Sequence, residues 1–248
     1  MSDPRLYCDL ALSEGASIPL DKDASHYLVS VMRRREGETV RLFNGKDGEW
    51  TAEISTANRK GALLTVQARL RASAGVPDVD LLFAPVKKAR TDFIVEKATE
   101  LGVRRLRPVI TRRTIAERVR TDRLAALARE AAEQTERFDL PEIAEAEALE
   151  RVLAGWPEER VLIFCDEAGD AAPMAQALAG LGGRPVAILT GPEGGFTPEE
   201  REIIRAIPSA IPVSLGPRIL RADTAAAAAL TLFQAICGDW AGDAQPRE

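Results

Sequence analysis

The stretch LTGPEGGFTPEE, residues 189–200, leaves an apolar run, crosses a loop with three glycines and one proline, and enters a helix. Thr197 suits the N-cap of this helix, Pro198 its first position, and Glu200 completes a capping box. The preceding run, PVAILTG, is short and apolar throughout, as in a strand buried on both faces. The stretch therefore predicts a strand-to-helix loop at the carboxyl end of a parallel strand, where α/β sheets bind ligands.

This loop lacks the features of the common phosphate-binding loops. A dinucleotide site of the Rossmann type needs G-x-G-x-x-G and an acidic residue about 20 positions later, whereas the glycines here are Gly191, Gly194 and Gly195. The G-K-[ST] of phosphate-loop NTPases is also absent. A simple connecting turn needs only one or two glycines, so three glycines beside Pro192 and Phe196 indicate a backbone that approaches a ligand closely.

A second loop of the same kind follows near the C-terminus. SLGPRILRADTAAAAAL, residues 214–230, leaves a short apolar strand through a Gly-Pro pair and enters an Ala-rich helix headed by Asp223 or Thr224. Ile219 and Leu220 are unexpected in a solvent-facing loop. They are suited to be the walls of a site for a flat apolar group such as adenine.

The rest of residues 78–248 alternates short apolar segments with helical ones. VDLLFAPV, LRPVI, RVLIFCDE and IPVSLG have the pattern of strands. KKARTDFIVEKATELG, TDRLAALAREAAEQTERF and AAPMAQALAGL have the pattern of helices; in the first, the residues expected to face inward are Phe93, Ile94, Ala98 and Leu101. This alternation predicts an α/β domain with a parallel sheet covered on both faces.

Residues 1–72 follow a β pattern instead. Short alternating strands are separated by glycine turns, including the hairpin turn NGKDG at residues 44–48. In GALLTVQARL, the residues expected on one face are Leu64, Val66 and Ala68. We predict a compact β-barrel domain, with a boundary in the small Gly/Pro-containing segment ASAGVPD that follows.

Composition excludes several classes of protein. The 248 residues are 46% hydrophobic and 29% charged, as in a soluble globular protein, and no apolar run approaches the roughly 18 residues of a membrane span. The start, MSDPRLYCDL, lacks a secretory pattern, so we expect a cytoplasmic protein. Three cysteines far apart and a single histidine predict neither a metal site nor a disulfide framework.

Positive charge is clustered although the formal net charge is −5. The negative total argues mildly against general nucleic-acid binding, but two arginine clusters stand out. One lies in RRLRPVITRRTIAERVR, residues 104–120, and the other in the N-terminal part. Either is a solvated face or a contact to RNA phosphates. The candidates for RNA contact are Arg33, Arg34, Arg35, Arg112 and Arg113.

GPEGGFTPEE followed by LGPRILRADTA, with KKARTDFIVEKATELGV upstream, resembles the RsmE family of the SPOUT methyltransferase superfamily. The resemblance extends over essentially the whole chain. It implies a PUA-like RNA-binding β-barrel at residues 1–72 and an α/β domain with a trefoil knot at residues 78–248. It further implies a homodimer without a metal, S-adenosyl-L-methionine as methyl donor, and methylation of N3 of a uridine in small-subunit (16S) ribosomal RNA.

The resemblance also suggests residue roles. We expect main-chain atoms of the two loops to hold the donor, and Arg221, ahead of Arg218, to stabilise negative charge on the uridine as N3 loses its proton. Glu193 and Asp223 are candidates to accept that proton, although Asp223 stands where the family more often has Glu. The expected cofactor-binding residues are Leu189, Thr190, Gly191, Pro192, Glu193, Gly194, Gly195, Leu215, Gly216, Ile219, Leu220, Arg221, Thr224 and Ala225.

Three alternatives stay open at the level of sequence. One is a SPOUT enzyme acting on another RNA, such as a transfer RNA ribose methyltransferase. Another is a catalytically silent RNA-binding protein. The third, an NAD-linked oxidoreductase, lacks the acidic partner for the ribose.

Overall fold

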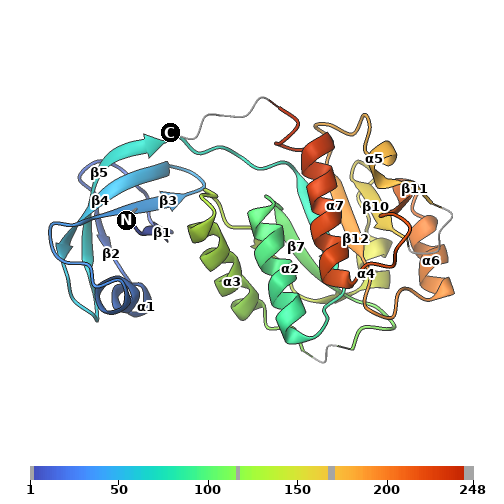
Figure 1. Ribbon diagram of the computed structural model, residues 1–248, viewed down its shortest axis with the longest axis horizontal. Helices are drawn as coiled ribbons and strands as arrows, with labels where there is room; N and C mark the ends of the chain where they lie inside the picture. Colours follow the sequence, from blue (N-terminus) through green and yellow to red (C-terminus); the bar gives the residue numbers. More distant parts are fainter. Residues whose placement is uncertain (1–2, 116–117, 167–170, 243–248) are drawn as a thin grey trace. The chain divides into compact units, whose positions relative to one another are not determined.

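The computed structural model describes residues 3–115, 118–166 and 171–242, which form two compact units (Figure 1). The first unit comprises Met1–Gly75 and Ala132–Leu140, and the second comprises Val76–Ala131 and Pro141–Glu248. The return of residues 132–140 to the first unit is a feature that the sequence pattern did not indicate. No helix in the described part of the chain has the length and apolar character to cross a membrane.

The first unit is built on a five-stranded sheet in the order β1-β3-β4-β5-β2. Its elements are β1 (Arg5–Tyr7), β2 (Ser17–Pro19), α1 (Lys22–His26), the π-helical turn η1 (Tyr27–Val31), β3 (Thr39–Asn44), β4 (Gly48–Thr56) and β5 (Leu63–Arg71). Leu64 and Val66 are buried as expected, whereas Ala68 is exposed because β5 continues beyond the core. The turn between β3 and β4 needs Gly48, whose φ is +87°.

A parallel sheet in the order β11-β13-β10-β12-β6-β7-β8 organises the second unit, and β9 also pairs with β7. The strands are β6 (Val79–Phe83), β7 (Arg105–Ile110), β8 (Glu142–Ile143), β9 (Glu147–Ala148), β10 (Val161–Cys165), β11 (Ala172–Pro173), β12 (Val186–Thr190) and β13 (Ala210–Ser214). Every residue of β6, β10 and β12 is buried, including Asp80 of β6, which confirms that these strands are covered on both faces.

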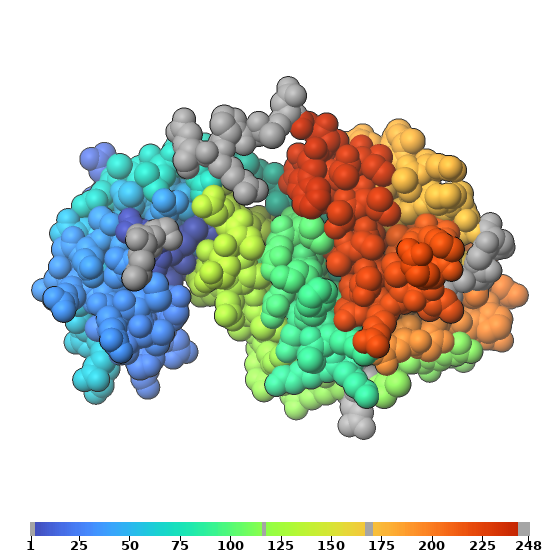
Figure 2. All heavy atoms as spheres, in the orientation of Figure 1, coloured from blue at the N-terminus to red at the C-terminus, as the bar shows by residue number. Residues whose placement is uncertain are grey.

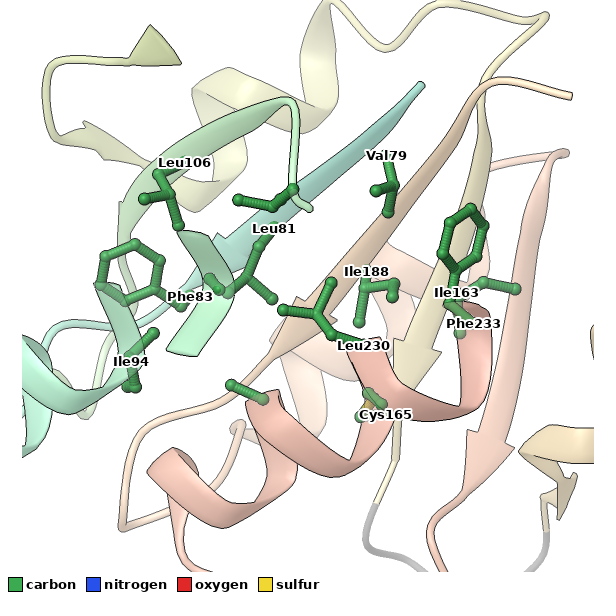
Figure 3. Close-up of a cluster of buried hydrophobic side chains, with 14 of the residues drawn as sticks. Val79, Leu81, Phe83, Ile94, Leu106, Ile163, Cys165, Ile188, Leu230 and Phe233 are labelled. Carbon is green, nitrogen blue, oxygen red and sulfur yellow. The ribbon is translucent and has the colours of Figure 1, made fainter. Parts of the chain in front are cut away.

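Helices cover both faces of this sheet. On one face lie α2 (Lys88–Glu100), α3 (Thr121–Gln134), α5 (Met174–Ala177) and α7 (Ala222–Ile236), and on the other lie α4 (Leu149–Ala154) and α6 (Pro198–Arg205). Figure 3 shows the larger core, in which Leu230 and Phe233 of α7 lie against Ile188 of β12 and the neighbouring strands. In Figure 2, α2 (green) lies beside α7 (red), in agreement with their direct packing.

Three expectations for the helices were wrong. Phe93 is 40% exposed, because the buried face of α2 runs through Thr91, Ile94 and Ala98 and the next position lies about 100° around the helix. The helix expected from residue 121 to residue 138 ends at Gln134, and Glu136 just beyond it has a φ of +60°, which does not fit a right-handed helix. The helix expected over residues 171–181 is confined to α5, after which Gly180 adopts a φ of +83°.

Candidate functional site

The two glycine loops line one cavity of about 500 Å³ at the carboxyl edge of the parallel sheet. Residues 190–195 begin at the last residue of β12, and residues 213–220 end β13 and lead to α7. Because β10 lies between β12 and β13 in the sheet, its carboxyl end contributes Cys165 and Asp166 to the same cavity. This volume is within the range of roughly 300–1,000 Å³ that is typical of small-molecule sites.

Most residues expected to bind a cofactor lie in this lining. Leu189 does not, because its side chain is buried within β12, and Arg221 and Thr224 are exposed at the start of α7 without lining the cavity. Ile219 is 88% exposed and lines the cavity together with Leu220. The expected residues in the lining are Thr190, Gly191, Pro192, Glu193, Gly194, Gly195, Leu215, Gly216, Ile219, Leu220 and Ala225.

Two of the glycines in the loops are required by their surroundings. A Cβ on Gly191 would stand 2.7 Å from Cε2 of Phe196, a distance that real Cβ atoms essentially never show. Phe196 is itself fixed, since it is buried and packs edge-to-face on Phe164 with 5.2 Å between the ring centroids. Gly216 has a φ of +109°, which favours glycine. The loop backbone can therefore lie against a ligand without intervening side chains.

Two arginines from outside the loop hold residues 192–195 in place. Arg90, in the first turn of α2, forms an ion pair with Glu193. Arg113, just after β7, donates a hydrogen bond from Nη1 to the carbonyl oxygen of Gly194 at 2.7 Å. The loop also closes on itself, because the amide of Gly195 donates to the carbonyl of Pro192 at 2.9 Å. The conformation of the loop after β12 therefore depends on residues that follow β6 and β7 as well as on the loop itself.

The start of α6 is fixed by the expected capping box and by one further bond. Thr197 accepts from the amide of Glu200 at 3.2 Å, and Oε2 of Glu200 accepts from the amide of Thr197 at 2.8 Å. Oε1 of the same buried carboxylate accepts from the amide of Arg112 at 2.7 Å. The pKa of Glu199 is held below its usual value by hydrogen bonds from its own amide and from Thr197.

The three catalytic candidates occupy different positions. Glu193 lines the cavity and pairs with Arg90. Arg221 is the exposed N-cap of α7, and Asp223 in the first turn accepts a hydrogen bond from the amide of Thr224 at 3.0 Å. Of the two arginines considered for charge stabilisation, Arg218 lines the cavity and Arg221 lies two residues beyond Ile219 in the same loop.

Several residues of the cavity were not expected from the sequence. The most notable is Asp166, which is 3% exposed and pairs with Arg205 at 2.7 Å and with Arg201. The sequence feature that could have indicated it is the acidic residue directly after the apolar strand in RVLIFCDE, because ligands bind at the carboxyl ends of such strands. Cys165 and Val213 were also not expected, whereas Ser214, Pro217 and Ala222 belong to the second loop, whose main chain was expected to hold the donor.

The chemistry of the lining suits a nucleoside-like ligand that carries no phosphate. Among the described residues of the lining, the only cationic side chain is Arg218, and the two carboxylates, Asp166 and Glu193, are paired with arginines outside the lining. Thr190 is 1% exposed, and its Oγ1 has no hydrogen-bond partner within the described residues, so it can bond to a ligand. With one cation in its described lining, the cavity has little to neutralise a phosphate, so a ligand without one fits it better.

The arginines expected to contact RNA are distributed over both units. In the first unit, Arg33 and Arg35 are exposed directly after η1, and Arg34 pairs with Glu38 at 3.8 Å. Arg112 and Arg113 lie in the second unit, at the carboxyl end of β7. Among the residues that the structure describes, no group of His, Cys, Asp and Glu is placed to hold a metal ion.

Comparison with known proteins gives the family. Residues 74–234 match the RNA methyltransferase domain and residues 20–67 the RNA methyltransferase PUA domain. The ribosomal RNA small subunit methyltransferase E of Rickettsia conorii is 30% identical over 228 residues, which are 91% of this chain and 93% of that protein.

Solved structures agree with this match. A methyltransferase of Legionella pneumophila with bound SAM is similar at a TM-score of 0.88 and 28% identity, covering 96% of this chain and 100% of that one. The ribosomal RNA small subunit methyltransferase E of Neisseria gonorrhoeae, bound to S-adenosyl methionine, gives a TM-score of 0.87 and 27% identity with the same coverage. These matches confirm the predicted architecture, a PUA-like domain before a SPOUT-type α/β domain, and the chain belongs to the ribosomal RNA small subunit methyltransferase E family.

Proposed function

We propose that this protein transfers a methyl group from S-adenosyl-L-methionine to N3 of a uridine in small-subunit (16S) ribosomal RNA. The observation that carries the proposal is the convergence of residues 190–195 and 213–220 on one cavity whose described lining has a single cationic side chain. The relatives from Legionella pneumophila and Neisseria gonorrhoeae, which hold S-adenosylmethionine, support the same choice of donor.

The proposed donor site uses main-chain atoms and a few side chains. Amides and carbonyls of residues 190–195 and 214–224 recognise the adenine and ribose, while Ile219 and Leu220 supply apolar walls. The Oγ1 of Thr190 gains the partner that it lacks within the chain. When bound, S-adenosylmethionine would supply an activated methyl group on a positively charged sulfur and would bring no phosphate that the lining has to neutralise.

On the acceptor side, the enzyme must help a weakly acidic uridine N3 to lose its proton. In our proposal the guanidinium of Arg221 stabilises the negative charge that develops on the uridine oxygens. Glu193, which pairs with Arg90, or Asp223 accepts the proton. Positioning of the base against the donor site contributes a large part of the acceleration.

RNA binding in this proposal depends on the two arginine clusters, Arg33 to Arg35 and Arg112 with Arg113. They neutralise phosphates, so affinity falls steeply with salt. The target uridine reaches the cavity as a loop base turned out of its stack. In this proposal, the first unit recognises the RNA around the target uridine.

The organisation of the protein is part of the same proposal. We assign residues 1–72 to the RNA-binding domain and residues 78–248 to the catalytic domain, with the trefoil knot in the latter. The active form is a homodimer in the cytoplasm. Ile219 supports the dimer, because an isoleucine that is 88% exposed beside the cavity is a surface that a second copy would cover.

Mapping of modified nucleotides tests the function. Small-subunit RNA from cells with the gene should contain an N3-methyluridine that is absent from deletion cells and returns on complementation. If deletion changes a transfer RNA instead, the enzyme acts on another RNA. Titration calorimetry with S-adenosylmethionine should give saturable binding; no measurable heat would favour the silent RNA-binding protein.

A further inference from the structure

A second cavity, of about 430 Å³, lies in the second unit at the carboxyl end of β6. It is bounded by residues 85–88, by the first turn of α2 and by residues 118–124. None of the described residues that line it is acidic. Five are cationic: Lys87, Lys88, Arg118, Arg120 and Arg123.

Internal ion pairs neutralise only part of this charge. Arg120 pairs with Asp122 at 2.6 Å, and Arg123 pairs with Asp92. Lys87, Lys88 and Arg118 have no carboxylate partner among the residues that the structure describes. Three unneutralised cations around one hollow raise the local positive potential, so the cavity attracts an anion.

The backbone of α2 adds to this potential. The helix runs for 13 residues from Lys88, and Lys87 at its N-cap makes no side-chain capping bond. The first amides of a helix have no i−4 partner within it; here the amide of Arg90 donates to the carbonyl of Lys87 at 2.9 Å, and the Lys87 side chain caps none of the amides. A helix N-terminus without a side-chain cap favours a negatively charged group, because an oxyanion can accept hydrogen bonds from the first N–H groups of the helix.

The second cavity lies next to the donor cavity. β6 and β12 are neighbours in the sheet, with Phe83 opposite Thr190, and the amide of Ala84 donates to the carbonyl of Thr190 at 3.2 Å. Arg90, one turn into α2, pairs with Glu193 of the donor loop. The first turn of α2 therefore contributes to both sites, and Figure 1 shows α2 and α3 starting at this same edge of the sheet.

The described linings of the two cavities differ in charge. The donor cavity has one cation and two carboxylates that are already paired, Asp166 with Arg201 and Arg205 and Glu193 with Arg90, whereas five cations and no carboxylate line the second. We propose that the second cavity binds one backbone phosphate of the RNA close to the target nucleotide and thereby positions the base at the donor site. That the anion belongs to RNA rests on the proposed function. The positive charge of the cavity and its place beside the donor cavity are independent of that function.

The test is the double variant Lys87→Ala/Lys88→Ala, with Arg184→Ala as matched control. Both lysines are exposed, and Arg184 is an exposed cation at the opposite, amino end of β12. RNA affinity, measured by fluorescence anisotropy, should fall roughly ten-fold or more in the double variant, and the slope of log K against log salt should lose about one unit or more. S-adenosylmethionine affinity should stay at the wild-type value, and Arg184→Ala should change neither quantity by more than about two-fold.

Neutral linkages in the RNA separate a phosphate contact from a general charge effect. A single methylphosphonate near the target uridine should weaken wild-type binding several-fold and should have no further effect in the double variant. If no linkage behaves in this way, or if the double variant binds RNA like the control, the proposal is wrong. Inorganic phosphate should compete only weakly; competition equal to that of the RNA would assign the site to free phosphate and would also overturn the proposal.

These outcomes separate the site from the enzyme activity. Wild-type protein that binds RNA through the lysines and methylates nothing would contradict the proposed function alone. If the wild-type protein methylates RNA and the double variant does so with the same KM for RNA, the phosphate site alone would be contradicted.

Discussion

The guanidinium of Arg113 donates a hydrogen bond to the carbonyl oxygen of Gly194, 81 residues later in the chain, with 2.7 Å between Nη1 and the oxygen. The stem of the same side chain packs against Gly194, where a Cβ would stand 3.3 Å from Cδ of the arginine. Arg113 was predicted from its cluster as an RNA contact. The structure gives it a second role, since it holds the loop that lines the donor cavity.

We therefore expect Arg113→Ala to weaken S-adenosylmethionine binding itself. Loss of one such hydrogen bond should raise the Kd roughly three- to ten-fold. Arg112→Ala is the control, because the Arg112 side chain is largely exposed and pairs with Glu150 at 3.3 Å, away from the cavity lining. Titration calorimetry without RNA measures both variants. Equal Kd values for the two would mean that Arg113 does not fix the loop.

The local features of the fold could be predicted because they depend on neighbouring residues. The capping box of Thr197 and Glu200 and the fully buried β12 follow from short patterns, and the structure confirms them. The predicted buried face of α2 was wrong at Phe93. A rotation of the helix by one residue moves a side chain from core to solvent, and an apolar stripe remains whether or not Phe93 is placed in the buried face. Periodicity alone does not decide between them.

The rest of the site depends on the order of strands, which no short pattern encodes. Asp166 reaches the cavity only because β10 lies between β12 and β13. Arg90 meets Glu193 because β6 is the other neighbour of β12. The sequence shows that both loops end apolar strands, and the crossovers that bring these strands together arise from the packing of the whole sheet.

Gly191→Ala should disrupt the loop that Gly191 begins. Its Cβ would collide with the ring of Phe196, which the T-shaped packing on Phe164 prevents from moving freely. Overpacking of this kind costs about 1–3 kcal/mol of the free energy of unfolding, and S-adenosylmethionine binding should weaken with it. Gly155→Ala, with nothing within 4 Å of the new Cβ, is the control. Urea unfolding and calorimetry compare the two, and a Gly191 variant as stable as the control would contradict the expectation.

Glu200→Ala should destabilise the protein more than Thr197→Ala does. The glutamate carboxylate accepts from the amides of both Thr197 and Arg112, so its loss leaves two donors without a partner, at about 1–3 kcal/mol for each buried one. Loss of the Thr197 cap alone costs about 1 kcal/mol. Urea unfolding at neutral pH measures both free energies. Equal losses would show that the bond to Arg112 contributes nothing.

Arg221→Ala should lower kcat and leave donor binding nearly unchanged. Arg221 is exposed at the N-cap of α7 and does not line the donor cavity, so its removal leaves the proposed donor contacts intact. Loss of one group that stabilises developing charge typically costs roughly 10²–10³ in kcat. Single-turnover methylation of the RNA at saturating donor gives the rate, and calorimetry gives the Kd of S-adenosylmethionine. Arg221→Lys, which keeps the charge, should recover part of the rate. A wild-type rate for Arg221→Ala would transfer the role to Arg218, the arginine that lines the cavity.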